Sequence, residues 1–209
     1  EDALDALEPI IGLEEFAWDL STRAFVKQHT QAELDFSSIA KGYAVDLASD
    51  ALLEMGIEHF MLEVGGEVQV RGLSPRGDRW RLAIENPVPA RAGGVYAAIA
   101  VTDVGIATSG DYRNFFVDKG TRYSHLIDPR TALPIEHDLV SVTVVHPSTM
   151  VADAWATALM VVGTEEALRL ANLYELGVTL ISRDGQQLVS SNNGVMAQWL
   201  TTSTQEDAL

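Results

Sequence analysis

Residues 35–56, DFSSIAKGYAVDLASDALLEMG, form the stretch that decides how this chain folds. Apolar residues recur along it at three- and four-residue spacing, which is the period of one face of a helix. Ser37 or Ser38 is expected to cap the start of this helix, and Gly56 is expected to end it in a left-handed conformation. The apolar face expected to turn toward the core contains Ile39, Ala40, Tyr43, Ala44, Leu47, Ala48, Ala51, Leu52 and Met55.

Lys41 lies in the first turn of this expected helix, where the free N–H groups already carry partial positive charge. A cation at such a place is typical of a site where N–H groups and an ammonium group together hold an anion, such as phosphate. A surface lysine without any ligand explains the same position equally well. The position of Lys41 alone does not decide between these two interpretations.

The charge and composition of the chain exclude several classes of function. Its 209 residues carry a formal charge of −16 and include no cysteine. Nucleic acid and anionic membranes repel an acidic surface, so neither is expected as a partner. Disulfides, thiolate metal sites and cysteine nucleophiles are also excluded. No apolar run reaches the length of a membrane span. A phosphate ligand would therefore need local positive charge from lysine, a helix N-terminus or a divalent metal ion.

The remaining pattern predicts many strands and two further helices. An almost wholly apolar stretch at 149–163 predicts a buried helix, and 165–176 predicts another that ends at Gly177. Strands are expected at 15–20, 24–29, 59–64, 67–72, 80–85, 95–101, 139–145, 178–181, 187–190 and 196–200. Strands that follow a helix in series, rather than alternating with helices, predict an α+β fold. Residues 41–70 and 164–190 share the order helix, glycine, strand, glycine turn, strand, which predicts an internal duplication.

Three short segments between these elements are candidates for contact with a ligand. The glycine pair at 65–66 forms either a simple tight turn or a place where a ligand approaches the backbone. Residues 108–110, with the sequence TSG, are expected in a turn with exposed N–H groups. His125 is expected inside a strand at 123–129, where a lone histidine is more often structural than catalytic.

Asp153 and Thr157 interrupt the apolar helix four residues apart and therefore lie on one of its faces. A buried carboxylate is costly unless it is paired or bound to a metal ion. Carboxylate and hydroxyl oxygens suit Mg²⁺, which keeps several waters and bridges to phosphates. The more frequent alternative at this spacing is that Asp153 pairs with a basic residue and Thr157 bonds back to its own helix.

Five segments taken together are similar to the motif series of the ApbE-type family of FAD:protein FMN transferases. They are SSIAKGYAVD, EVGGEVQVRG, IATSGDYRNFF, YSHLIDPRTALP and ADAWATALMVVG, and the resemblance covers about residues 7–181. It implies one ApbE-like domain over residues 1–209, with an α+β fold of two related helix-plus-antiparallel-sheet halves. Two serines at 37–38 and Ala132 stand where the family usually has glycine.

The N-terminal segment that supplies much of the flavin-ring contact in this family has no counterpart in the sequence. We therefore expect an N-terminally truncated member, with polar tails at about 1–6 and 201–209 that are poorly ordered. Whether a chain without that segment is active is left open by the sequence.

The resemblance implies Mg²⁺-dependent transfer of FMN from FAD to a threonine hydroxyl of an acceptor protein, with release of AMP. Hydrolysis of FAD to FMN and AMP, and flavin binding without catalysis, are the alternatives. The implied partners are FAD, as substrate, and an acceptor flavoprotein subunit, such as a subunit of the sodium-translocating NADH:quinone reductase. The implied location is the periplasm or cell envelope.

Site residues follow from the same resemblance. The metal ligands are implied to be Asp153, Thr157 and the backbone carbonyl of Ser38. Lys41 is implied to act on phosphate or to organise the metal site, and His125 to lie near the reacting phosphates, with the general base left open. With Asp153, these two residues form the implied catalytic set. The residues implied to contact the nucleotide are Ser38, Lys41, Gly65, Gly66, Thr108, Ser109, Gly110 and His125.

Overall fold

The fold is described from a computed structural model that defines residues 10–88, 94–110, 115–118 and 121–201. A six-stranded antiparallel sheet in the order β14-β13-β12-β7-β4-β3 forms its centre. Its strands are β3 (Phe60–Val64), β4 (Glu67–Arg71), β7 (Val104–Gly110), β12 (Leu139–His146), β13 (Gly177–Asp184) and β14 (Gln187–Asn192). Helices precede both outer hairpins, so the α+β prediction is confirmed.

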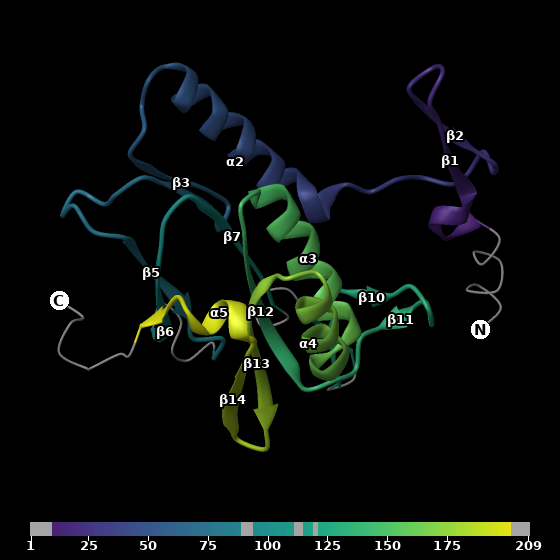
Figure 1. The fold of residues 1–209 in the computed structure, drawn as a ribbon. Helices are drawn as coiled ribbons and strands as arrows, with labels where there is room; N and C mark the ends of the chain where they lie inside the picture. The colour runs from purple at the N-terminus through teal and green to yellow at the C-terminus, as the bar shows by residue number, and fades with distance from the viewer. Residues whose placement is uncertain (1–9, 89–93, 111–114, 119–120, 202–209) are drawn as a thin grey trace.

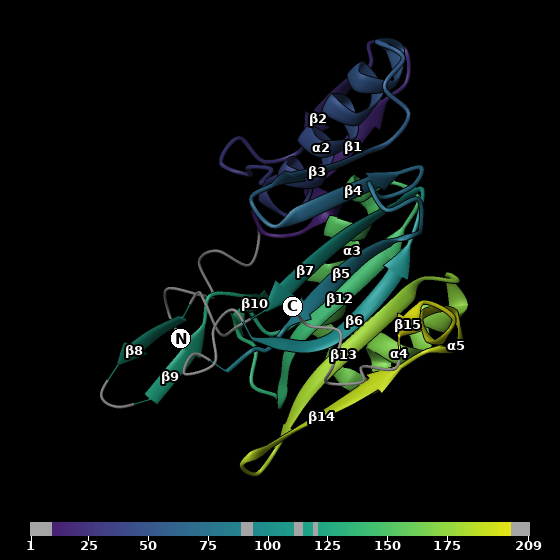
Figure 2. The same ribbon diagram turned by 90° about the vertical axis from the view of Figure 1, so that its left-hand side faces the viewer.

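Helices cover one face of the central sheet and a small sheet covers the other (Figures 1 and 2). The helices on the first face are α2 (Ser37–Glu54), α3 (Thr149–Val162) and α4 (Thr164–Leu173). The short α5 (Gly194–Ala197) lies on the side of the small sheet, where its Met196 packs in the same core cluster as Ile99. The small sheet has the order β15-β6-β5, formed by Leu200–Thr201, Val95–Val101 and Trp80–Glu85. The helix at 149–163 and the hairpin strands at 59–72, 80–101 and 177–192 lie close to their predicted positions.

In the described part of the chain, one 3-10 helix and three two-stranded sheets lie outside these layers. A 3-10 helix, η2 (Leu13–Glu15), leads into the hairpin of β1 (Phe16–Asp19) and β2 (Ala24–Lys27). Figure 1 shows this hairpin apart from the central sheet, joined to α2 by an extended segment. The pairs β8 (Phe115–Asp118) with β9 (Thr121–Ser124), and β10 (Ile127–Asp128) with β11 (Leu133–Pro134), are also antiparallel.

Strand β12 is buried on both faces because it lies between two layers of core. Val142 and Val144 pack in the cluster under α3 and α4. Val140 and Val145 pack in the cluster under the small sheet. The side chains of a strand point alternately to its two faces, and an irregularity in the pairing between Leu139 and Ser141 shifts this alternation at Val140. One strand therefore supplies both cores. A charged side chain or a cavity introduced in β12 would therefore disturb both core layers.

Helix α2 is confirmed, but both its start and its buried face differ from the prediction. Phe36 precedes the first helical residue, and the carboxylate of Asp35 accepts the backbone N–H of Ser37 at 2.7 Å, so the predicted serine cap is wrong. Gly56 has φ +80°, as predicted for the residue that ends the helix. The buried residues are Gly42, Val45 and Ser49, whereas Tyr43 and Leu47 are about half exposed.

Four other local predictions are wrong. Residues 108–110 belong to β7, where they pair with residues 141–143 of β12, and do not form a turn. His125 lies in a bend between β9 and β10, not inside a strand. Glu175, with φ +54°, takes the left-handed conformation after α4, while Gly177 already begins β13. The predicted strand at 196–200 begins in α5 and continues in a turn, and only its last residue enters β15.

A helix followed by a β-hairpin occurs twice, as α2-β3-β4 and as α4-β13-β14. The two hairpins form opposite edges of the central sheet. The internal duplication itself stays a prediction. Of the polar tails, residues 1–6 and 202–209 lie outside the described residues. Within the described part of the chain, no helix combines the length and apolar character needed to cross a membrane.

Candidate active site

A cleft of about 970 Å³ opens between the start of α2, the β3–β4 turn, strand β7 and the small sheet. Every residue predicted from the sequence as a site residue lines it: Ser38, Lys41, Gly65, Gly66, Thr108, Ser109, Gly110, His125, Asp153 and Thr157. The fold therefore gathers five segments that are far apart in the sequence. His125 lies exposed on the wall of this cleft, in the bend after β9.

Asp153 is a buried carboxylate in the cleft, with an exposed fraction of 3%. The backbone N–H of Gly42 donates to its Oδ2 at 2.9 Å, and the ammonium group of Lys41 lies 4.0 Å from its Oδ1. Burial raises the pKa of Asp153 above its ordinary value, although the Gly42 hydrogen bond and the Lys41 charge act in the opposite direction. These two contacts therefore do not fully compensate the burial of this charge.

Hydroxyl groups from β7 and β12 add to the polar lining of the cleft. Ser109 Oγ lies 3.2 Å from Thr157 Oγ1, and this contact joins β7 to α3. Thr108 Oγ1 lies 2.9 Å from Thr143 Oγ1 on β12. Residues 108–110 pair with β12, and the preceding residues 104–106 of the same strand pair with β4, so the side chains of 108–110 are presented on a strand and not on a loop.

Glu67 is a site residue that the sequence reasoning missed. Its side chain is 2% exposed, lines the cleft directly after the glycine pair, and forms an ion pair with Lys41. Its Oε2 has no hydrogen-bond partner among the described residues. Burial raises the pKa of Glu67, while the contact with Lys41 acts to lower it. Lys41 thus lies between two buried carboxylates.

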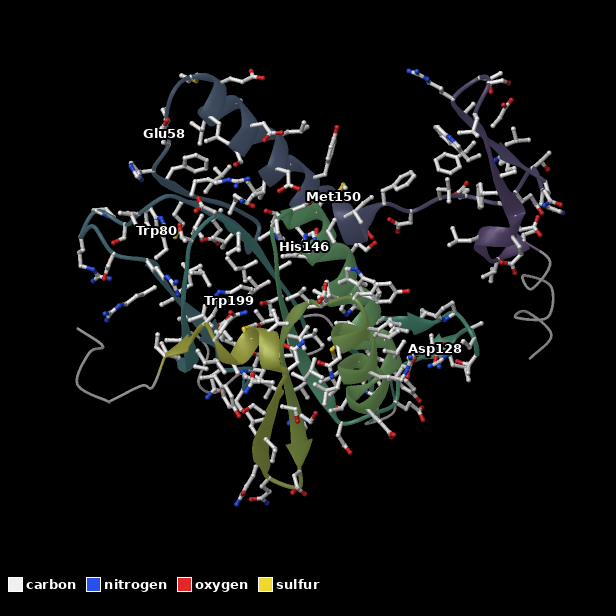
Figure 3. The ribbon with its side chains drawn as sticks, viewed as in Figure 1. Glu58, Trp80, Asp128, His146, Met150 and Trp199 are labelled. Carbon is white, nitrogen blue, oxygen red and sulfur yellow. The ribbon has the colours of Figure 1, made fainter. Side chains whose placement is uncertain are left out.

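The close approach of α2 and α3 sets the geometry of this end of the cleft. A Cβ atom at Gly42 would lie only 2.5 Å from the carbonyl oxygen of Thr149 and 2.7 Å from the Cα of Met150. Figure 3 shows Met150 where α2 meets the start of α3, with His146 of β12 beneath it. Glycine at position 42 therefore allows the backbone of α2 to lie directly against α3.

Asp46, one turn further along α2, binds the N-terminus of α3. Its carboxylate accepts the Ser148 hydroxyl at 2.6 Å and the backbone N–H groups of Thr149 and Met150 at 2.8 and 3.0 Å. A carboxylate at this end of a helix satisfies free N–H groups and interacts favourably with the helix dipole. Asp46 belongs to the SSIAKGYAVD motif, but residue spacing alone could not show that it contacts residues 148–150, which are more than 100 positions away.

Asp46→Asn is expected to lower the free energy of unfolding by about 1–2 kcal/mol at pH 7, because the amide cannot accept all three hydrogen bonds. Burial alone would raise the pKa of Asp46, but the hydrogen bonds from Ser148, Met150 and Thr149 outweigh it and hold the pKa below 3.8. A lowered pKa adds stability that is present above the ordinary pKa and is lost as the pH falls through the folded-state value. The difference between the two proteins should therefore shrink below about pH 4.

Urea unfolding of both proteins at pH 7 and at pH 3 measures this difference. Asp50→Asn, an exposed position one turn along the same helix, is the matched control and should change little. A constant difference at both pH values would show that the Asp46 charge does not hold the two helices together.

Side chains of the cleft supply only some of the oxygen ligands that a small divalent cation needs. No group of three His, Asp or Glu side chains that could hold a metal ion occurs among the described residues. Asp153 and Thr157 offer one carboxylate and one hydroxyl oxygen. The Ser38 carbonyl belongs to the first turn of α2, and a backbone carbonyl oxygen has two lone pairs, so it can coordinate a cation even where it accepts a helix hydrogen bond. These three oxygens, with waters and phosphate oxygens, suit Mg²⁺.

Comparison with known proteins identifies the family. The model of the ApbE family matches residues 1–181. A protein from Vibrio cholerae named FAD:protein FMN transferase is 43% identical over 182 residues, which cover 87% of this chain and 53% of that protein. Its namesake from Escherichia coli is 37% identical over 190 residues, which cover 88% of this chain and 53% of that protein.

Solved structures agree with this result. The flavin transferase ApbE from Vibrio cholerae superposes with a TM-score of 0.85 at 38% identity and covers 96% of this chain and 62% of its own. The apo form of the Pseudomonas stutzeri flavinyl transferase ApbE gives 0.84 at 36% identity, with coverage of 97% and 61%. The chain spans about half the length of the curated relatives it matches. On this evidence the chain belongs to the ApbE family.

Proposed function

We propose that this chain transfers FMN from FAD to a threonine hydroxyl of an acceptor protein and releases AMP, with Mg²⁺ bound. The observation that carries the proposal is the cleft that brings together Lys41, Asp153 and Thr157. It also contains Oε2 of Glu67, which has no hydrogen-bond partner among the described residues. The relatives that match most of this chain are named FAD:protein FMN transferases, which supports the same activity.

The lining of the cleft suits both parts of such a substrate. Apolar side chains from β5, β6 and β7, among them Leu82, Ile84, Ile99 and Ile106, line it. They would contact an aromatic ring system and exclude water from it. Lys41, Asp153 and the hydroxyl groups of Ser109 and Thr157 also line the cleft and would contact a pyrophosphate.

Attack on a pyrophosphate depends on neutralised charge and an aligned leaving group more than on a strong base. Mg²⁺ bound at Asp153, Thr157 and the Ser38 carbonyl would neutralise charge on the phosphate oxygens. Lys41, whose side chain is 45% exposed, remains able to contact the phosphate from the protein side. We assign to His125, exposed on the cleft wall, assistance in moving the proton of the attacking hydroxyl.

The proposal is tested by incubating the chain with FAD, Mg²⁺ and a threonine-containing acceptor domain. Chromatography measures AMP, and mass spectrometry measures the addition of FMN to the acceptor. AMP together with a modified acceptor is the expected result. AMP without modification, in a series of acceptors, would instead establish hydrolysis of FAD. FAD binding without AMP would identify a binding module and contradict the proposed chemistry.

A further inference from the structure

We propose that Glu67 is a positioning residue that holds the ammonium group of Lys41 and thereby keeps the Asp153 carboxylate available to a divalent cation. This inference rests on the proposed function, because it takes Asp153 as a ligand of that cation. It assigns a role to a side chain that is neither a proposed metal ligand nor a proposed contact of the substrate.

Lys41 has two carboxylates within ion-pair distance, and they compete for it. Its Nζ contacts Oε1 of Glu67 and lies 4.0 Å from Oδ1 of Asp153. The contact with Glu67 includes a hydrogen bond, whereas the approach to Asp153 is longer than a hydrogen bond. The position of the ammonium group is therefore set by Glu67.

The shape of the β3–β4 turn supports this placement of the Lys41 side chain. Gly65 has φ +63°, and a Cβ atom there would lie 3.1 Å from Cδ of Lys41 and 3.8 Å from Oε2 of Glu67. The aliphatic part of Lys41 thus passes closely over a residue without a side chain on its way to Glu67. The glycine and the carboxylate two residues later act together on the same lysine.

Stability does not explain why Glu67 is a buried acid. Its Oε2 is buried without a hydrogen-bond partner in the described part of the chain, and burial raises its pKa. Such a group lowers the stability of a fold unless its partner compensates fully, and here the partner Lys41 is about half exposed. A neutral side chain at position 67 should be tolerated by the fold, so the acid has to be explained by what it does to Lys41.

Loss of the Glu67 charge would leave Asp153 as the nearest carboxylate for Lys41. The ammonium group would then approach Asp153 and compete with a divalent cation for the same oxygen. The effect of Glu67 on cation binding should accordingly pass through Lys41. A general effect of negative charge would instead act whether Lys41 is present or not. This difference can be measured without any catalytic turnover.

The experiment measures Mg²⁺ affinity by calorimetry on the full chain without FAD. Four proteins form a cycle: the unsubstituted chain, Glu67→Gln, Lys41→Met, and the double variant. Glu67→Gln is expected to bind Mg²⁺ about tenfold more weakly, as is usual when a group that orients a metal site is removed. In the Lys41→Met background the same substitution is expected to change the affinity less than about threefold.

Glu54→Gln removes the same charge at an exposed position about 20 Å along α2 from Lys41 and should leave the affinity unchanged. The melting temperature of Glu67→Gln without metal should equal or exceed that of the unsubstituted chain. Equal loss of affinity in both backgrounds, or no loss in either, would overturn the proposal. If the unsubstituted chain itself fails to bind Mg²⁺, the metal assignment of the proposed function is contradicted first and this inference falls with it.

Discussion

Asp153→Ala is expected to reduce the release of AMP from FAD by at least about 100-fold, because it removes the buried carboxylate on which the proposed Mg²⁺ site depends. Lys41 and Thr157 cannot replace it, since one is a cation and the other a neutral hydroxyl. Chromatographic measurement of AMP at saturating Mg²⁺ gives the result directly. Undiminished release by this variant would contradict the assignment of Asp153 to the metal site.

Asp153→Asn separates the charge of this residue from its packing. The amide oxygen can still accept the Gly42 N–H, which donates to Asp153 at 2.9 Å. Since burial raises the pKa of Asp153, the ionised form is the one that the metal-free fold disfavours. A raised pKa means that the metal-free protein loses stability as the pH rises above the ordinary value of 3.8.

The Asn variant should therefore match or exceed the melting temperature of the metal-free parent at pH 7, and should still lack AMP release. Added Mg²⁺ should raise the melting temperature of the parent but not that of the variant. A variant that unfolds at lower temperature in the absence of metal would show that the charge stabilises the fold and does not serve a cation.

The order of motifs in the sequence was sufficient to predict ten of the residues that meet in the cleft, but not Glu67. It was not sufficient to predict how they are held there. The TSG segment at 108–110 has the composition of a turn, yet it forms the end of β7 because β12 offers it a complete ladder. Tertiary pairing overrides local preference in such a case.

Glu67 shows a second limit of sequence patterns. Val68 and Val70 alternate with Glu67 and Gln69 along β4, which predicts that the polar pair faces solvent. Both polar residues are in fact buried, because α2 and α3 cover that face of the strand. The pattern of polarity along β4 cannot show that Lys41 of α2 will contact the buried Glu67. Glu67 could have been found only by asking which partner Lys41 would have.

Helix α2 shows a third limit, and it concerns size rather than polarity. The spacing of large apolar residues predicted the wrong buried face, since Tyr43 and Leu47 remain about half exposed. The face that is buried carries Gly42, Val45 and Ser49, which are small enough for α2 to lie against α3. Close packing of two helices selects small residues at the contact, so hydrophobicity alone points away from it.

Gly42→Ala is the substitution that tests this contact. Alanine favours a helix over glycine by about 1 kcal/mol, so helix propensity alone predicts stabilisation. The added Cβ would lie 2.5 Å from the Thr149 carbonyl oxygen, 2.7 Å from the Met150 Cα and 2.8 Å from the Met150 nitrogen. All three are backbone atoms at the start of a buried helix and cannot move aside cheaply. We expect a net loss of about 1–3 kcal/mol in the free energy of unfolding, measured by urea titration.

If the added Cβ pushes α2 away from α3, the site should be impaired as well. The Gly42 N–H donates to Asp153, and Lys41 is the neighbour of Gly42 in α2. Mg²⁺ affinity is therefore expected to fall together with stability, and AMP release to fall with it. Ala44→Gly, an exposed position two residues along the helix, calibrates the propensity term and should cost about 1 kcal/mol without affecting Mg²⁺ binding. A Gly42→Ala protein that is more stable than its parent and binds Mg²⁺ equally well would mean that α2 and α3 do not lie in direct backbone contact.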